Sequence, residues 1–467
     1  MRINELIQLG RGYLLTGFVV AVFIVVMIYM FYGKIYKKDH MITIGNIIWI
    51  MVFSCYMIVI FSATLLDRSD FFRHQKIMPL FYSYKDAWIQ GSVTAWRNII
   101  LNIIAFIPFG FLIPAGIKKM QQFWKTYLAG FLFTLLIETI QLITGRGLFE
   151  VDDLIYNTLG SIIGYGIFTI IKAIICKVRK RCKTPYTWKK LLLFQIPLIF
   201  TILFFAGTYI AYQNQEYGNL SIENILPYEK ENFEVSTDIK MEDKEDIFTV
   251  YKCNIFTKDE MIKFAEKFYD VLGVSFDKKN IEFYGDAAMF RSDSGYDLWV
   301  YYKGGRFTLI DFETMHGEDH YKINKHPDEQ EVKDALLQYG IHIPDEVPME
   351  EAENNSVKFE MSITNDRSII EGYVSGTYYE NGRFGEIEHN FIKYDYYKDV
   401  KIISPKEAYG DLCQGKFNYY GDEYLKIKVK NYEIRYSVDT KGFYQPYYSF
   451  DCDINGEDVR LEVPAIK

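Results

Sequence analysis

The sequence predicts a helical membrane bundle of about six spans followed by an α+β domain outside the membrane. Six apolar stretches in the first half each contain about 20 residues or more, enough to cross ~30 Å of hydrocarbon at ~1.5 Å per helical residue. Residues 1–213 carry 22 Lys and Arg against 9 Asp and Glu, whereas residues 214–467 carry 30 against 51. Beyond the apolar stretches, short alternating segments rich in Tyr, Phe, Ile and Val are typical of strands.

The first five predicted spans form a bundle over residues 1–176, and residues 177–213 add a basic loop and the sixth span. We interpret the first stretch as a retained span, because it is long and no small-x-small cleavage site precedes its lysine cluster. Six helices apolar on nearly every face do not fit a soluble protein. The predicted spans are residues 13–32, 42–66, 98–117, 124–144, 153–176 and 190–212.

Lysines and arginines next to the spans collect in three loops that share one side of a six-span arrangement, around residues 34–38, 118–125 and 177–190. Because cytoplasmic loops keep the positive charge, these loops are expected inside. Both termini, the loop from Asp67 to Arg97 and the acidic domain are then expected outside, in a multi-pass protein of the cell membrane. The acidic domain has a formal charge of −21 and would repel phosphate backbones, which argues against nucleic acid as a partner.

Residues 214–467 form the predicted extracytoplasmic domain, after a polar linker over residues 211–234. Helices are expected at residues 257–273, 328–340 and 404–415, two of which open with a capping-box pattern. Strands follow each helix, which predicts an α+β fold with two α-β-β-β units. The domain holds three cysteines, so at most one internal disulfide is expected. These cysteines are Cys253, Cys413 and Cys452.

Polar side chains within the spans are costly in lipid, so their positions indicate a bundle interior or a cavity. They recur at helical spacing on three predicted spans, and in the six-span arrangement their ends meet at the outer leaflet. We expect a polar ligand-binding pocket there, although the same groups could serve only to hold the helices together. The candidate ligand-binding residues are Asn98, Asn102, Glu138, Gln141, Arg146, Asp152, Asp153 and Asn157.

Four further residues of the same spans have expected structural roles. Gly160 and Gly164 form a GxxxG pattern, whose missing side chains let another helix approach closely. Pro108 removes a backbone donor within the third span, which is expected to loosen its helix. Gly110 follows Pro108 in the same span.

At these residues the sequence resembles the VanZ-like family over about residues 45–170. The shared block has an Asn before F-x-P-x-G, then E-x-x-Q, an Arg, a D-D pair and N-x-x-G-x-x-x-G. The elements are present as Asn102, Phe106, Pro108, Gly110, Glu138, Gln141, Arg146, Asp152, Asp153, Asn157, Gly160 and Gly164. The resemblance implies a Gram-positive cell membrane protein of the kind named for resistance to the glycopeptide teicoplanin. The chain adds some 250 residues, whose ending resembles PepSY-like and YycI-like extracytoplasmic domains.

Three functions follow as hypotheses. In the first, the outer-leaflet pocket binds a lipid-linked cell-wall precursor or glycopeptide-type ligand. In the second, the bundle is an intramembrane enzyme acting on an envelope lipid, with Glu138 or Asp153 as general acid or base. In the third, the spans anchor a regulator that contacts an envelope protein through its outer domain. No cofactor is expected, and we interpret the histidines between residues 316 and 326 as solvated rather than metal-binding.

Overall fold

The computed structural model describes residues 43–66, 77–145, 149–179, 186–222, 231–278, 280–317, 321–351, 356–365, 367–419 and 424–466. Contacts between residues divide the chain into two compact units. The membrane unit comprises Met1–Trp88 and Ser92–Gln215, and the C-terminal unit comprises Ile89–Gly91 and Glu216–Lys467.

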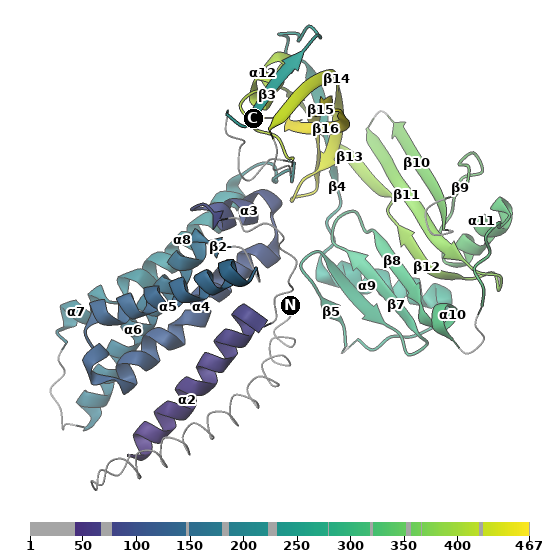
Figure 1. The fold of residues 1–467 in the computed structure, drawn as a ribbon. Helices are drawn as coiled ribbons and strands as arrows, with labels where there is room; N and C mark the ends of the chain where they lie inside the picture. The colour runs from purple at the N-terminus through teal and green to yellow at the C-terminus, as the bar shows by residue number, and fades with distance from the viewer. Residues whose placement is uncertain are drawn as a thin grey trace. The chain divides into compact units, whose positions relative to one another are not determined.

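Within the described residues, five helical segments of the membrane unit are long and apolar enough to cross a bilayer, which confirms a helical membrane region. They are Ile44–Leu65, Val93–Gly116, Phe123–Thr144, Val151–Arg179 and Trp188–Asn214. The first predicted span, residues 13–32, lies outside the described residues. The helices themselves are α2 (Ile44–Phe61), α4 (Val93–Gly116), α5 (Phe123–Thr144), α6 (Val151–Arg179), α7 (Trp188–Leu193) and α8 (Ile196–Asn214), with a π-helical turn, η1 (Ser62–Leu66), after α2 and a short 3₁₀ turn, η2 (Lys118–Met120), after α4 (Figure 1).

Helices α4 and α6 approach each other closely because glycines line their contact. A Cβ added at Gly160 would lie 2.1 Å from the Ile103 carbonyl oxygen, and one at Gly164 would lie 2.1 Å from that of Ile107. On the facing helix, a Cβ at Gly110 would lie 1.9 Å from the Ser161 carbonyl oxygen. No side chain fits at these distances, so all three glycines are required for this backbone-to-backbone packing.

Helix α4 continues through both of its prolines, Pro108 and Pro114. A proline removes one backbone donor and crowds the preceding turn, which leaves carbonyl groups available to other donors. The hydroxyl of Tyr56 on α2 donates to the Ala105 carbonyl at 3.0 Å, and the Gln121 side-chain amide donates to the Pro114 carbonyl at 3.0 Å. Tyr56 of α2 and Gln121 after α4 thus each hydrogen-bond a carbonyl of the helix that contains the two prolines.

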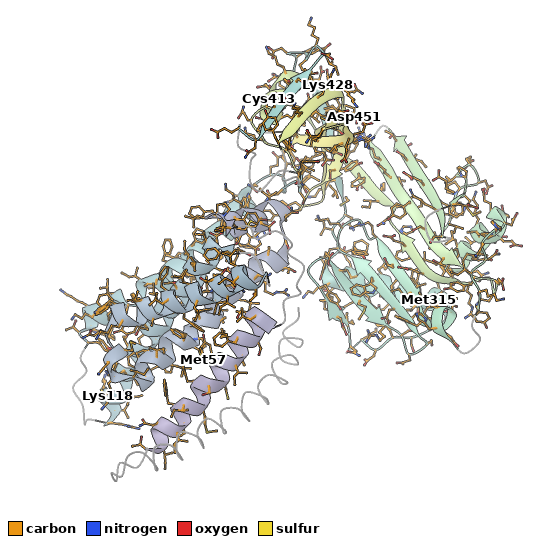
Figure 2. The ribbon with its side chains drawn as sticks, in the orientation of Figure 1. Met57, Lys118, Met315, Cys413, Lys428 and Asp451 are labelled. Carbon is orange, nitrogen blue, oxygen red and sulfur yellow. The ribbon has the colours of Figure 1, made fainter. Side chains whose placement is uncertain are left out.

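The loop expected between residues 67 and 97 contains a short helix, α3 (Tyr82–Gln90), preceded by β1 (Ile77–Met78). Strand β1 pairs in parallel with β2 (Phe149–Glu150), which leads directly into α6. The Tyr84 ring of α3 packs edge-on against Trp96 of α4 at 5.3 Å and lies 5.6 Å from Phe204 of α8. Helix α3 thus lies at the start of α4 and beside the second half of α8, where Trp88 also packs edge-on against Tyr212, whereas Lys118 lies at the opposite end of the bundle (Figure 2).

The C-terminal unit is built on one mixed sheet of 14 strands, which confirms an α+β domain. The central order is β3-β14-β15-β4-β13-β11-β12-β8-β7-β6-β5, and among the strand pairs that the structure describes only β3–β14 is parallel. Strand β16 joins β15, and β9 joins the sheet through β10. The strands are β3 (Phe233–Thr237), β4 (Ile247–Cys253), β5 (Glu282–Phe283), β6 (Ala287–Arg291), β7 (Tyr296–Tyr301), β8 (Phe307–Asp311), β9 (Glu350–Glu351), β10 (Val357–Asn365), β11 (Ser368–Tyr378), β12 (Phe384–His389), β13 (Ile392–Lys401), β14 (Leu425–Val438), β15 (Phe443–Ile454) and β16 (Glu457–Pro464).

Helices cover two separate cores of this sheet. The helices are α9 (Lys258–Leu272), α10 (Phe312–His316), α11 (Glu329–Gln338) and α12 (Pro405–Leu412). Residues of α9 and α11 pack with β6–β8 and β10–β12 in the first core, and α12 packs with β3 and β14–β16 in the second (Figure 1). Both expected capping boxes are present, at Thr257 with Glu260 and at Ser404 with Glu407. Along the chain, α9 is followed by strands β5–β8, and α12 is followed by strands β14–β16. Cys253, Cys413 and Cys452 are free thiols.

The first part of the expected linker, residues 211–234, is instead ordered. Helix α8 continues to Asn214, and the next residues bind the β14–β15 turn. The Gly218 N–H donates to the buried Asp439 carboxylate at 2.5 Å, and the Asn219 N–H donates to the Thr440 hydroxyl at 2.8 Å. A Cβ on Gly218 would lie 2.5 Å from the Lys441 nitrogen. From Glu216 onward the chain therefore belongs to the C-terminal unit.

Candidate functional site

The Asp152 carboxylate, in the first turn of α6, binds the backbone that begins α3. The Phe81 N–H donates to Oδ1 at 2.6 Å and the Ser83 N–H donates to Oδ2 at 2.8 Å. Asp152 is 2% exposed, so both of its oxygens are used within the protein. A carboxylate that accepts first-turn N–H groups stabilises a helix start. Asp152 therefore fixes α3 to the start of α6.

Two further carboxylates lie around the β2 strand. The Glu150 N–H donates to Oε2 of Glu138 at 3.2 Å, and the Ser83 hydroxyl donates to Oε2 of Glu150 at 2.7 Å. Glu138 is 1% exposed and lies on α5. Its carboxylate therefore binds the backbone just before α6, which connects the ends of α5 and α6.

Helix α4 joins this group through Asn102. Its side-chain amide donates to Oδ1 of Asp153 at 2.5 Å. Asp153 is 6% exposed and Asn102 is half-buried. A charge-assisted hydrogen bond of this kind is stronger than a neutral one, so it compensates in part for burying the carboxylate.

In the side chains of Gln141 and Asn157, the amide nitrogen makes a hydrogen bond and the amide oxygen makes none within the described residues. The Gln141 amide nitrogen donates to the Thr64 carbonyl in η1 at 2.9 Å, and the Asn157 amide nitrogen donates to the Thr134 hydroxyl at 2.9 Å. The Oε1 of Gln141 and the Oδ1 of Asn157 are buried without a hydrogen-bond partner in the described part of the chain. Such an orphan acceptor costs about 1–3 kcal/mol, so its retention calls for an explanation.

Six of the eight sequence-predicted site residues thus hydrogen-bond within the membrane unit, on α4, α5 and α6, and two of them, Asn102 and Asp153, bind each other directly. We call them the polar cluster; they are Asn102, Glu138, Gln141, Asp152, Asp153 and Asn157. Asn98 does not join them, because it is exposed and makes no hydrogen bond within the described residues. One turn separates Asn98 from Asn102, but only Asn102 faces α6. Arg146 lies outside the described residues.

Sequence reasoning missed the partners of these groups, namely Thr64, Phe81, Ser83 and Thr134. Thr64 and the backbone at residues 81–83 contribute through carbonyl and N–H groups, which leave no trace in side-chain type. Thr134 could have been found, because it lies one turn before Glu138 on the same face of α5. Among the described residues, no group of three or more His, Cys, Asp or Glu side chains is arranged to hold a metal ion.

The membrane unit is similar to proteins of known family. Residues 47–172 match the VanZ/LLP1 family model. These residues form a VanZ/LLP1 domain. Protein VanZ of Enterococcus faecium is 27% identical over 115 residues, which cover 24% of this chain and 71% of the relative. The resemblance predicted for residues 45–170 is confirmed, and the polar cluster lies entirely within the VanZ/LLP1 domain.

Two solved structures resemble the chain at low sequence identity. An uncharacterized protein from Eubacterium rectale covers 50% of this chain and 89% of its own, at 9% identity and a TM-score of 0.23. The Bacillus megaterium YpeB C-terminal domain covers 46% of this chain and 95% of its own, at 13% identity and a TM-score of 0.20. At these TM-scores neither structure supports an argument about the region beyond the VanZ/LLP1 domain.

Proposed function

We propose that this VanZ-like membrane protein binds a sugar-bearing envelope ligand, lipid-linked or of the glycopeptide type, at the polar cluster. The observation that carries the proposal is the pair of buried amide oxygens on Gln141 and Asn157, which are 1% and 4% exposed and lack hydrogen-bond donors in the described residues. A ligand that supplies donors would satisfy both oxygens.

The remaining acceptors favour an uncharged donor. Both oxygens of Asp152 accept backbone N–H groups, Asp153 accepts from Asn102 and Glu138 accepts from the Glu150 N–H. Glu138 and Asp153 each take part in a further interaction as well. The carboxylates are therefore occupied, and the free acceptors are neutral amide oxygens. Sugar hydroxyls match them, whereas phosphate oxygens would be repelled.

The two oxygens also indicate the extent of the ligand. Asn157 binds Thr134, which lies seven residues before Gln141 on α5, about 10 Å along the helix axis. Glu138 lies between them on the same face. A ligand that reaches both oxygens must extend along α5, past Glu138, toward the π-helical turn whose Thr64 carbonyl accepts from Gln141. Such turns are frequent at functional sites.

The proposal places the cluster at the outer leaflet and the C-terminal unit outside the cell, in keeping with the basic loops on the opposite side. The resistance phenotype implied by the VanZ resemblance would then follow from the chain's binding of teicoplanin or of the precursor that teicoplanin recognises. The intramembrane-enzyme hypothesis has less support, because the carboxylates that it requires as acid or base are held by backbone and side-chain donors.

The test uses the full-length chain in lipid nanodiscs and measures its thermal unfolding. Two sugar-bearing probes, diglucosyl diacylglycerol in the bilayer and soluble teicoplanin, distinguish a lipid-linked ligand from a free glycopeptide. Phosphatidic acid with matched acyl chains is the phosphate control. We expect one sugar-bearing probe to raise the melting temperature of the wild type and phosphatidic acid to leave it unchanged.

Two variants connect the shift to the site. Gln141→Leu combined with Asn157→Leu removes both orphan oxygens and should abolish the shift, whereas Asn98→Leu alters an exposed amide of the same unit and should preserve it. Gel filtration verifies that both variants are folded. The proposal fails if the double variant responds as the wild type does, or if phosphatidic acid stabilises the wild type as much as the sugar-bearing probes. In a teicoplanin-sensitive Gram-positive host, the double variant should likewise lose any protection that the wild type confers.

A further inference from the structure

Three large apolar side chains are exposed just before α3, in the segment of residues 77–81 that we call the apolar tip. Ile77 is 61% exposed, Leu80 is 43% exposed and Phe81 is 59% exposed. We propose that the apolar tip inserts into the acyl chains of the bilayer and anchors the polar cluster at a fixed depth. This inference does not depend on ligand binding, because it concerns the outside of the tip rather than the buried amides.

Phe81 adopts a backbone conformation that L-residues with large side chains avoid. Its φ is 68°, one of only two positive values among the non-glycine residues that the structure describes. The left-handed region costs a residue with a Cβ roughly 1–2 kcal/mol. Asp152 offsets this cost, since its buried carboxylate accepts the Phe81 N–H at 2.6 Å. Strain that is maintained by a buried charge, at a residue whose side chain contacts little protein, indicates a role for the exposed ring.

The position of the tip along the bundle follows from its hydrogen bonds. Ile77 and Met78 pair with Phe149 and Glu150, the two residues directly before α6. The tip therefore lies at the level where an apolar span begins, which is the interface between hydrocarbon and head groups. Aromatic and apolar side chains at this level sit in the bilayer surface.

Lipid is the occupant that the neighbouring surface supports. On α6, Ile155 lies one turn inside the span and is 47% exposed, and α4 exposes Ile100 and Ile104. These apolar faces belong to predicted membrane spans, and the tip pairs with the two residues directly before one of them. Moving these three side chains from water into the acyl chains would gain about 25 cal/mol for each Å² of apolar surface removed from water.

The experiment photolabels the full-length chain in liposomes of phosphatidylglycerol that carries a diazirine on its acyl chain. Mass spectrometry then locates the adducts. We expect adducts on residues 77–81 at a yield comparable with Leu203, an α8 residue that is 65% exposed. Val271 on α9 in the C-terminal unit is 57% exposed and provides the matched control for exposure without lipid contact.

A substitution separates lipid contact from folding. Phe81→Asn removes the apolar ring, but Asn tolerates the left-handed region. The fold should therefore persist while labelling of the tip is lost. An unchanged melting temperature verifies the fold. The inference is overturned if the wild-type tip is labelled no more than Val271, or if Phe81→Asn leaves the labelling of the tip unchanged. Neither result would affect the test with sugar-bearing probes.

Discussion

The side chain of Asp152 determines the backbone path at one end of the bundle, since each of its oxygens accepts one N–H group from the start of α3. Replacing it with Ala would leave the Phe81 and Ser83 N–H groups at the start of α3 without their acceptor, and the loss of such a helix cap costs about 0.5–2 kcal/mol. We therefore predict that Asp152→Ala lowers the melting temperature of the full chain in detergent markedly. Asp152→Asn retains one acceptor oxygen and should lower it less.

The matched control for Asp152 is Asn98→Ala, which changes an exposed polar side chain of the same unit and should leave the melting temperature unchanged. A selective increase in the reactivity of a cysteine introduced at Ser83 would further indicate that α3 has detached. Equal stability of Asp152→Ala and the wild type would contradict the assigned role.

In the C-terminal unit, burial against Phe307 lowers the pKa of His389 to about 4. The Nδ1 of His389 has no hydrogen-bond partner in the described residues, consistent with a neutral ring. As the pH falls from about 6.5, the unfolded chain binds a proton that the folded chain excludes, so stability decreases until the pH reaches about 4. The loss should total roughly 3 kcal/mol.

Hydrogen exchange of strands β8 and β12 in the full chain, measured between pH 7 and pH 4, checks this prediction after correction for intrinsic exchange. Other acidic groups also titrate in this range, so His389→Gln is the necessary comparison. This variant should show a weaker pH dependence than the wild type. An identical dependence in both proteins would exclude His389 as its source.

At the scale of single residues, the polar cluster was predictable because amides and carboxylates are costly in lipid. They are therefore rare in apolar spans, and each one indicates a position that faces the bundle interior. The sequence could not separate Asn98 from Asn102, because residues four apart lie on one face and only the packing of α6 decides which of them is covered. Nor could it predict that Phe81 adopts a positive φ, since phenylalanine gives no sign of this conformation.

Among the secondary-structure elements, the contact between α4 and α6 depends on positions without side chains. We predict that Gly164→Ala destabilises the membrane unit by roughly 1–3 kcal/mol, because the new Cβ would meet the Ile107 carbonyl oxygen at 2.1 Å and the Gly110 Cα at 3.0 Å. Gly207→Ala on α8 is the control, since a Cβ there meets nothing within 4 Å. Unfolding in detergent should distinguish the two, and equal effects would contradict the packing argument.

Helix ends and spans were predictable because their signals are local. Apolar runs of about 20 residues identify spans, and a capping box with a following glycine defines α9 by residues that are neighbours in sequence. The pairing of β1 with β2 and the order of the large sheet join residues far apart in the chain, and no local pattern specifies these partners. The polar segment after α8 was misjudged as a linker for the same reason, because its hydrogen-bond partners lie more than 200 residues away.

For the whole molecule, chain direction relates the polar cluster to the C-terminal unit. Helix α6 begins at the cluster, and α8 returns so that Tyr84 of α3 contacts Phe204 in the middle of α8 and Trp88 contacts Tyr212 near its end. The C-terminal unit follows directly at Glu216. We therefore predict that the cluster and the C-terminal unit lie on one side of the membrane, and that the basic loops make this the outer side.

Cysteine labelling of intact cells with a membrane-impermeant maleimide tests this sidedness in the full chain with its native cysteines replaced by alanine. Thr94→Cys at the start of α4 and Asp458→Cys in β16 should react without permeabilisation. Lys119→Cys and Lys189→Cys lie at the opposite, positively charged end and should react only after the membrane is opened. If Thr94→Cys and Asp458→Cys behaved differently, α8 would not return to the cluster end; if both required permeabilisation, the outward orientation would be wrong, and a ligand of the outer leaflet could not reach Gln141 and Asn157.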